Sequence, residues 1–250
     1  MAAPDWLTER PVAHRGFHDA SAGRIENTLA AAEAAMAKNF AIECDLQLTA
    51  DRRVVVFHDD TLDRLTRSSG AVAGKTLSEV RAARFRSGDA TIPSLEDLLD
   101  LVDGQVPLVI ELKSRWTKDR RLEAAAVEIL LGYEGPVSVM SFDPASMIAM
   151  RRLAPNIPRG MTADRFGAAE WPYLSLARRW ANRWLLSAPV VVPTFIAYDV
   201  TALPASAPLS LRHFFGVAIL AWTVRTGADR KIAREWADQI IFEGFDPDIA

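Results

Sequence analysis

Ionisable side chains follow four short apolar runs of the chain. They are His14 with Arg15, Glu43 with Asp45, His58, and Glu111 with Lys113. Charged residues are rarely buried in apolar surroundings unless they are paired or bind a metal. A single pair of this kind is usually exposed, and a lone histidine, such as His18 or His213, usually has no catalytic role. The combination of all four groups predicts one functional site.

The spacing within two of these groups places their side chains on one side of a strand. Residues two apart in a strand point the same way, so Glu43 and Asp45 share a side while Cys44 faces the other. Glu111 would join them as a third carboxylate. Because like charges close together resist ionisation, we expect a divalent cation between them. Ligation by oxygen alone favours Mg2+ or Ca2+ over zinc, and the sequence leaves the choice between these two open.

The remaining residues of the set suit a phosphate ester. Arg15 can bind a phosphate through two parallel hydrogen bonds, and Lys113 supplies a compact positive charge. His14 and His58 can exchange protons near neutral pH, one as base toward the attacking oxygen and the other as acid toward the leaving alkoxide. Metal, cations and two histidines together predict a phosphodiesterase.

Short apolar runs alternate with helical patterns along the whole chain. Predicted strands are 11–15, 41–46, 54–58, 107–113, 137–141, 158–162, 194–198, 217–223 and 239–243. Predicted helices are 27–38, 95–102, 120–131, 144–153, 170–186, 209–215 and 227–236. This alternation indicates parallel pairing. The number of strands is one more than a (β/α)8 barrel needs, so we interpret 41–46 and 54–58 as a barrel strand with a short hairpin partner.

These elements predict a (β/α)8 TIM barrel, in which active sites lie at the C-terminal ends of the strands. With 250 residues, the length is typical of one such barrel, and we expect a single domain over residues 1–250. Residues 60–93 form the longest loop-like region. We interpret this region as a short insertion that could form a lid beside the site.

Composition excludes several classes of protein. Net charge is -3, which argues against a protein that neutralises nucleic-acid phosphates. Cys44 is the only cysteine, so no intrachain disulfide is expected. The N-terminus lacks the pattern of a secretory signal, and no apolar stretch is long enough to span a membrane. We therefore expect a cytoplasmic protein.

The ordered motifs of the chain resemble those of the glycerophosphodiester phosphodiesterase family. They are His14-Arg15-Gly16, Glu26-Asn27-Thr28, Glu43-Cys44-Asp45, the run from His58 through Asp59 to Arg64, Glu111-Leu112-Lys113, and Trp222-Thr223. The resemblance covers nearly the whole chain. It implies hydrolysis of small glycerophosphodiesters to sn-glycerol 3-phosphate and an alcohol, within lipid and glycerol metabolism. It also implies His14 and His58 as the acid/base pair, metal ligation by the three carboxylates, and phosphate binding by Arg15 and Lys113.

Three residues depart from the usual pattern of that family. Ile25 stands where proline is usual, which affects loop stiffness. Arg225 stands where asparagine is usual, and Glu243 where aspartate is more common. These two are expected at the barrel rim, so they bear on substrate fit more than on chemistry. The short 60–93 segment also indicates that the larger inserted domain of some relatives is absent or reduced.

Several further residues are candidates for substrate binding. Trp222 could form an apolar wall against the substrate or pack inside the barrel. Phe17 could do similar work. In family terms Glu26 lies in the site and orients Arg15, although it could instead serve helix-start electrostatics. Asn27 is expected to cap the helix that follows.

Residues 170–186 carry three of the seven tryptophans. Tyr173, Leu176, Trp180 and Trp184 fall on one helical stripe, with arginines off it. Such a helix could touch a membrane surface or a second subunit, which leaves a peripheral membrane contact and a homo-oligomer open. The favoured interpretation is an outer barrel helix that packs its apolar stripe on the sheet.

Two alternatives to a hydrolase of small diesters deserve a test. The same barrel and metal could act on lipids, as in lysophospholipase D-like, sphingomyelinase D-like or phosphatidylinositol-specific phospholipase C enzymes. A barrel that only binds phosphodiesters would be expected to lack a histidine or a metal carboxylate, and none is missing here.

Overall fold

The computed structural model describes residues 2–249, which form two compact units. One unit is Val12–Val137. The other combines residues 2–11 with residues 138–249. We describe each by itself, and the single-domain organisation stays a prediction.

The Val12–Val137 unit is built on three parallel strands and one antiparallel partner. The strands are β1 (Val12–Ala13), β2 (Ala41–Leu48), β3 (Val54–Val56) and β4 (Leu108–Leu112). β2 pairs in parallel with both β1 and β4. β3 pairs antiparallel to β2, with Leu46 opposite Val56, which confirms the predicted hairpin. His58 therefore follows an antiparallel strand and not a parallel one, and the backbone pairing of Phe57 with Asp45 brings it beside β2.

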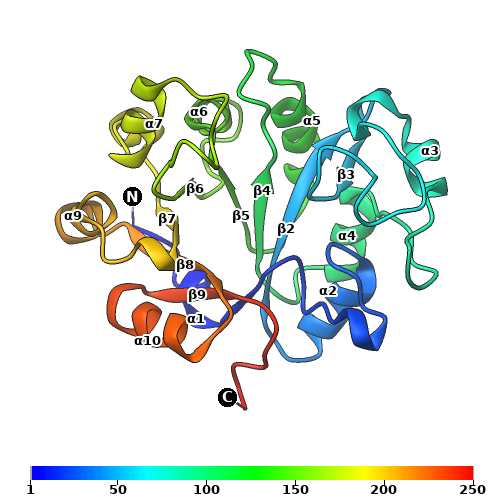
Figure 1. The fold of residues 1–250 in the computed structure, drawn as a ribbon, viewed down its shortest axis with the longest axis horizontal. Coiled ribbons are helices and arrows are strands. Elements are labelled where there is room, and N and C mark those ends of the chain that lie inside the picture. The colour runs from blue at the N-terminus through cyan, green and yellow to red at the C-terminus, as the bar shows by residue number, and fades with distance from the viewer. Residues whose placement is uncertain (1, 250) are drawn as a thin grey trace. The chain divides into compact units, whose positions relative to one another are not determined.

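The helices of this unit are α2 (Leu29–Met36), α3 (Leu77–Ala82), α4 (Leu95–Val102) and α5 (Arg121–Leu130). Figure 1 shows α2, α4 and α5 beside β2 and β4. α4 begins with a capping box in which Ser94 and Asp97 bond each other's backbone N–H groups. The prediction that Asn27 caps α2 is wrong. Thr28 is the N-cap, because Asn27 adopts a positive φ of 58° and its side chain bonds Asp45 instead.

Residues 60–93 are an ordered part of this unit. They contain α3 and the 3-10 turn Val72–Gly74. The segment packs through a buried apolar cluster that it shares with β3, the residue after β3 and the loop before α2: Ile25, Val55, Phe57, Leu62, Val72, Val80, Ala83, Phe85 and Ile92. The cluster connects the segment to the strand that precedes His58. Its role as a lid stays a prediction.

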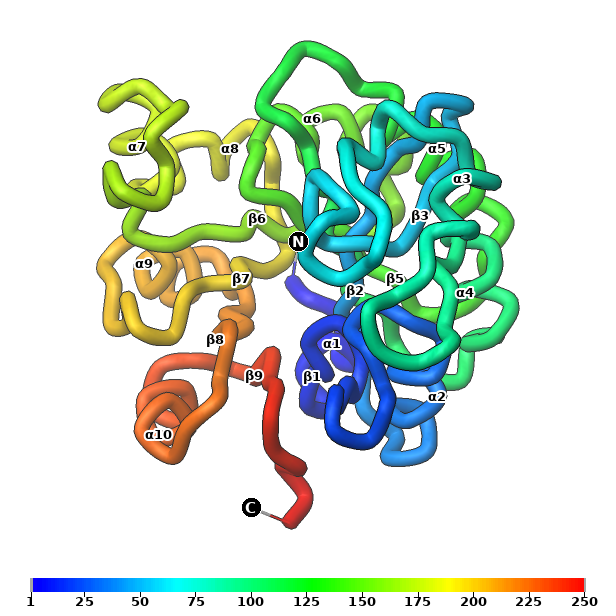
Figure 2. The backbone as a smooth tube through the Cα atoms, turned by 45° about the vertical axis from the view of Figure 1, so that its right-hand side comes forward, coloured from blue at the N-terminus to red at the C-terminus, as the bar shows by residue number. Residues whose placement is uncertain are grey.

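The second unit holds the other five parallel strands, of which β5 begins at the boundary between the units. They are β5 (Val137–Ser141), β6 (Arg159–Ala163), β7 (Phe195–Asp199), β8 (Ala218–Val224) and β9 (Gln239–Phe242), and each pairs in parallel with the next. The helices are α1 (Trp6–Glu9), α6 (Pro144–Leu153), α7 (Leu176–Arg183), α8 (Ala188–Val191), α9 (Ser206–Phe215) and α10 (Gly227–Trp236), with the 3-10 turn Val200–Ala202. In Figure 2, α7, α9 and α10 lie in succession beside β6, β7 and β8.

α7 corrects two expectations. The predicted helix 170–186 is shortened to Leu176–Arg183, because residues 170–175 are turns and irregular backbone that end at the N-cap Ser175, and Leu185 has a positive φ of 51°. Its apolar stripe does not pack on the sheet. Leu176 is 74% exposed and Trp180 is 55% exposed, and Asn182 is the one buried residue of the helix. The favoured packing interpretation of this helix is therefore wrong.

The succession of elements confirms the predicted fold class. Across the described residues, the eight parallel strands β1, β2 and β4 to β9 alternate with helices in the order of a (β/α)8 barrel. Most strand interiors are buried on both sides, as expected where helices cover a parallel sheet. None of the helices between residues 2 and 249 is long and apolar enough to cross a bilayer.

Candidate metal and phosphate site

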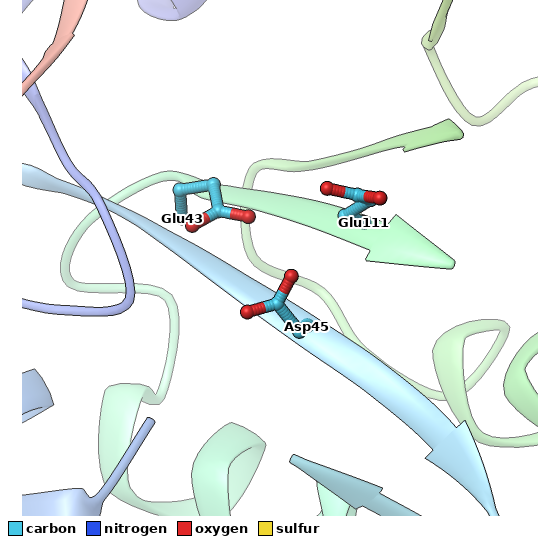
Figure 3. Close-up of side chains that lie close together, drawn as sticks. All are labelled: Glu43, Asp45 and Glu111. Atoms are coloured by element: carbon cyan, nitrogen blue, oxygen red, sulfur yellow. The ribbon is translucent and has the colours of Figure 1, made fainter. Parts of the chain in front are cut away.

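Three carboxylates converge in the Val12–Val137 unit. Glu43 and Asp45 lie on the same side of β2, and Glu111 lies opposite Asp45 in the pairing of β2 with β4. One oxygen from each can be chosen so that all three lie within 4.8 Å of one another, and all three residues are buried. Figure 3 shows the carboxylates of the two strands directed into one small space. The arrangement is suited to a metal ion.

Two cations contact this cluster. The Lys113 Nζ lies 2.9 Å from Asp45 Oδ1 and 2.9 Å from Glu111 Oε1. The Arg15 Nε lies 3.4 Å from Asp45 Oδ2. Both cations contact Asp45, and Lys113 contacts Glu111 as well. Glu43 accepts a 2.9 Å hydrogen bond from the backbone N–H of Arg15.

The carboxylates respond differently to this environment. Burial raises the pKa of Glu43 well above its ordinary range, and the charges of Asp45 and Glu111 raise it further. Burial also raises the pKa of Glu111, although Lys113 opposes the rise. Burial works against ionisation of Asp45 as well, but Lys113, His58 and Arg15 hold its pKa well below the usual range. The cluster thus carries more buried negative charge than its own cations balance, which is the condition a divalent cation relieves.

Both predicted histidines are near the carboxylates. The His14 Nε2 lies 3.9 Å from Glu43 Oε2. The His58 Nδ1 lies 2.7 Å from Asp59 Oδ1. Both imidazoles contribute to the lowered pKa of Asp45, so both act on the same buried group. Asp59 fixes the orientation of the His58 ring, a role that the sequence motif did not reveal.

The backbone around Arg15 is shaped to present its side chain. Arg15 has a positive φ of 57°, a conformation that non-glycine residues rarely adopt and that often marks functional sites. Gly16 follows with φ 78°, and a Cβ there would lie 2.8 Å from the backbone carbon of Ala31. Only glycine fits this approach between the β1 end and α2. The close packing explains why the arginine is followed directly by glycine.

Arg64 connects the two halves of this site. Its guanidinium donates two hydrogen bonds to Glu26, at 2.9 and 2.7 Å, and two to Asp59, at 2.5 and 2.9 Å. Glu26 in turn accepts a 2.6 Å hydrogen bond from Arg15. We call Arg64 with Glu26 and Asp59 the Arg64 bridge. It links the arginine beside the carboxylates to the histidine that follows β3.

Two amides, which sequence reasoning missed, position the same groups. Asn27 donates a 2.8 Å bond to Asp45 Oδ2 and accepts one from the Asp45 backbone. The Gln47 side chain donates to the carbonyls of Phe57 and Asp59, on either side of His58. The signal for Gln47 is its place on β2, two residues after Asp45 on the same side. A cavity of roughly 250 Å³ lies beside Gln47 and Lys113.

The two aromatic candidates, Phe17 and Trp222, contact other aromatic rings. The Phe17 ring packs edge-on against Phe40, with centroids 5.5 Å apart, and the Arg24 guanidinium lies 5.9 Å from the Phe17 ring centroid. In the unit of residues 138–249, Trp222 packs edge-on against Phe142, with centroids 5.5 Å apart. Phe142 also contacts Trp171, with centroids 4.9 Å apart. Trp222 therefore belongs to an aromatic cluster at the C-terminal ends of β5 and β8.

The two departures at the ends of β8 and β9 contact each other. The Arg225 Nε donates to Glu243 Oε1 at 2.7 Å. A longer cation and a longer carboxylate thus replace the usual shorter residues together. This ion pair joins the residue that follows β8 to the residue that follows β9.

Comparison with known proteins identifies the family of this chain. A model of the glycerophosphoryl diester phosphodiesterase family matches residues 14–249. The Bacillus subtilis protein YhdW is 36% identical over 181 residues, covering 68% of this chain and 73% of that protein. A glycerophosphodiester phosphodiesterase of Caldanaerobacter subterraneus is 34% identical over 160 residues, covering 60% of this chain and 65% of that enzyme, just under two thirds of its length.

Solved structures share the fold. An Oleispira antarctica phosphodiesterase, in complex with the product sn-glycerol-3-phosphate, has a TM-score of 0.77 at 23% identity, covering 94% of this chain and 92% of that one. A glycerophosphodiester phosphodiesterase of Agrobacterium tumefaciens has a TM-score of 0.69 at 26% identity, covering 93% of this chain and 95% of that one. Together with the family match over nearly its whole length, these findings show that the chain belongs to the glycerophosphoryl diester phosphodiesterase family.

Proposed function

We propose that this chain hydrolyses small glycerophosphodiesters to sn-glycerol 3-phosphate and an alcohol, using a divalent cation and two histidines. Family membership makes it a phosphoric diester hydrolase. The roles of the individual residues are our proposal. These roles rest on one observation: Glu43, Asp45 and Glu111 lie close together in the interior, beside His14.

The three carboxylates are the proposed metal ligands. They offer oxygen donors only, which suits Mg2+ or Ca2+. Such an ion, when bound, would polarise the phosphoryl oxygens and stabilise the charge that gathers on them. Asn27 supports the site by holding Asp45 in place through two hydrogen bonds.

Arg15 and Lys113 are the proposed phosphate-binding residues. Glu26 and Asp45 hold the Arg15 guanidinium on two sides. Asp45 and Glu111 hold the Lys113 ammonium. Preorganised cations of this kind stabilise developing negative charge without further rearrangement.

His14 and His58 are the proposed acid and base. Asp59 lies at hydrogen-bond distance from His58 Nδ1, which leaves the Nε2 of that ring to exchange a proton with the substrate. His14 presents its own Nε2 toward Glu43. We assign one nitrogen of each ring to proton transfer. Either histidine can be the acid, with the other as the base.

The product in the Oleispira antarctica complex supports a small glycerol phosphate as the substrate core. The second candidate is a lipid substrate, as in lysophospholipase D-like or sphingomyelinase D-like enzymes. One observation favours testing it: Leu176 and Trp180 are exposed. Self-association and a cytoplasmic location stay predictions from the sequence.

A substrate panel tests the proposal. Release of glycerol 3-phosphate from glycerophosphocholine is measured beside choline release from lysophosphatidylcholine, each with Mg2+ and Ca2+ separately. We expect faster turnover of glycerophosphocholine. Hydrolysis of lysophosphatidylcholine alone would assign the lipid alternative, and no turnover of either would remove the proposed activity.

A further inference from the structure

Residues 171–192 differ in composition from the rest of the chain. They carry three of the seven tryptophans and three arginines, and contain neither aspartate nor glutamate, within a chain of net charge -3. We call them the Trp171–Val192 segment. α7 and α8 lie within it.

α7 is amphipathic in the reverse of the usual orientation. A helix on a protein surface normally turns its apolar stripe toward the core and its polar stripe toward water. Here Leu176 and Trp180 are 74% and 55% exposed, and the polar Asn182 is the residue that α7 buries. The apolar stripe of this helix has no core to cover within its unit.

The exposed apolar surface continues on both sides of α7. Trp184 follows Trp180 with ring centroids 6.5 Å apart. The exposed large apolar residues of the segment are Tyr173, Leu176, Trp180, Trp184, Leu186 and Val190. Exposed apolar residues gathered in this way mark interaction surfaces, whereas single ones are common on any protein.

Cations accompany this surface. Arg178 and Arg183 are exposed and Arg179 is half-buried. None of these three forms an ion pair with a carboxylate within residues 2–249. The surface therefore combines aromatic rings with uncompensated positive charge.

Ring contacts connect this surface to the aromatic cluster of the same unit. Tyr173 contacts Trp171 at 5.8 Å between centroids, Trp171 contacts Phe142 at 4.9 Å, and Phe142 contacts Trp222 at 5.5 Å. The Trp171 indole also donates to Asp164, which fixes one end of the segment to the residue after β6. The segment is thus anchored by its first residue and presents its remaining aromatic rings outward.

We propose that the Trp171–Val192 segment docks the protein on an anionic phospholipid surface. Tryptophan and tyrosine favour the boundary between headgroups and acyl chains, and arginines beside them are attracted to anionic headgroups. A reversed amphipathic helix with aromatic and cationic residues is the element that lies in such a boundary. The proposal concerns binding alone and does not depend on the residue roles proposed for the phosphodiesterase site.

A second copy of this chain fits the surface less well. A twofold contact places the same patch of both copies together, so the three arginines would face three arginines with no carboxylate of the segment to pair them. An anionic lipid surface supplies the missing negative charge. Charge complementarity therefore favours lipid over self-association.

Vesicle sedimentation tests the docking. The purified chain is spun with vesicles of phosphatidylcholine alone and with vesicles of equal parts phosphatidylcholine and phosphatidylglycerol. We expect binding to the anionic vesicles, a blue shift of tryptophan emission, and weaker binding at high salt. Absence of sedimentation with anionic vesicles at low salt would overturn the proposal.

Matched variants distinguish binding through this surface from nonspecific adsorption to vesicles. Trp180→Ser, and separately Arg178→Ser with Arg183→Ser, should each lower vesicle binding by about tenfold or more. The control is Phe214→Ser with Phe215→Ser, which removes two rings of the same unit that are 72% and 70% exposed at the end of α9. The control should bind as the wild type does. All variants should turn over glycerophosphocholine normally.

Two outcomes would contradict the assignment. If the Phe214→Ser, Phe215→Ser control loses vesicle binding as strongly as Trp180→Ser, the Trp171–Val192 segment is not the docking surface. If the wild type sediments as a dimer in velocity centrifugation and Trp180→Ser as a monomer, with neither binding vesicles, a second copy covers the surface instead.

Discussion

Proteins usually bury apolar side chains and expose charged ones. The carboxylate cluster and the Trp171–Val192 segment depart from this rule in opposite ways. On β2 and β4, charged residues are buried: Glu43 and Asp45 are each 1% exposed. On α7, apolar residues face water. Most of a protein does neither, because burying charge and exposing large apolar surface both cost free energy.

This free-energy cost is offset differently in the two regions. The buried carboxylates have partners within the chain, including Lys113, Arg15 and Asn27. The exposed rings of Trp180 and Trp184 have mainly each other. The carboxylate cluster is therefore suited to a small ion and a phosphate, whereas the Trp171–Val192 segment needs a partner larger than a side chain.

The largest effect is expected at the histidines. His14→Ala or His58→Ala should lower kcat for glycerophosphocholine by about 100-fold to 10,000-fold, because each removes a proton-transfer group. Thermal unfolding should change little, since both rings are partly exposed. His213→Ala is the control, because His213 is exposed on α9 and should leave kcat unchanged. Full activity in either histidine variant would remove that residue from the chemistry.

The Arg64 bridge should have the next largest effect. Arg64→Gln removes the four hydrogen bonds to Glu26 and Asp59, so Arg15 and the Asp59–His58 pair lose their common support. Second-layer partners of this kind are worth about 10-fold to 100-fold in activity, and we expect the loss in kcat rather than in KM. Arg86→Gln serves as the control in the same segment, because the Arg86 side chain donates a hydrogen bond to the Asp63 carbonyl and none to Glu26 or Asp59 among the described contacts. Equal losses in both variants would indicate a general effect on the fold.

The same bridge predicts a dependence of stability on pH. Burial opposes ionisation of Glu26 and Asp59, yet hydrogen bonds from Arg64 leave the pKa of each below its ordinary value of 4.5 or 3.8. A lowered folded-state pKa stabilises the protein above the ordinary value, and this stabilisation is lost as pH falls through the folded-state value. Arg64→Gln should therefore cost roughly 0.5–1 kcal/mol at neutral pH, reduced by solvent screening of the half-exposed arginine.

Urea unfolding from neutral pH to about pH 3 measures this effect. The difference between wild type and Arg64→Gln should shrink as the solution becomes more acidic. A difference that stays constant over that range would show that charge on Glu26 and Asp59 is not its source.

The smallest effect is expected at the Arg225–Glu243 pair. This pair is partly exposed, so its coupling should be about 0.2–1 kcal/mol in a double-mutant cycle of Arg225→Ala and Glu243→Ala. A buried pair such as Lys113 with Asp45 should have a larger coupling energy, so the same cycle on both pairs measures the effect of burial. A coupling at Arg225–Glu243 as large as at the buried pair would contradict the importance assigned to burial.

Much of the carboxylate site could be predicted from the sequence. Glu43 and Asp45 alternate with Cys44, and the period of a strand leaves one arrangement for them. The ends of parallel strands meet, which brings Glu111 beside them. Positions within one regular element and its neighbour follow from local pattern alone.

Residues outside regular elements were not predictable in this way. Asn27 binds Asp45 because its backbone has a positive φ, which the sequence pattern concealed behind a plausible capping role. Arg64 is 38 residues from Glu26, and nothing in a linear pattern pairs them. The orientation of α7 was predicted wrongly for another reason. Its stripe has the same period whether it faces the core or water, so the pattern predicts the helix but not its orientation.

Cation-dependent stabilisation tests the central claim most directly. Thermal unfolding and glycerophosphocholine hydrolysis are measured on chelated wild type and Glu43→Gln while Mg2+ or Ca2+ is added. The account predicts that the cation raises the wild-type Tm and restores its activity, and that Glu43→Gln gains neither while unfolding, without cation, no lower than the wild type. Wild-type activity that survives exhaustive chelation, or equal stabilisation of both proteins by the cation, would contradict it.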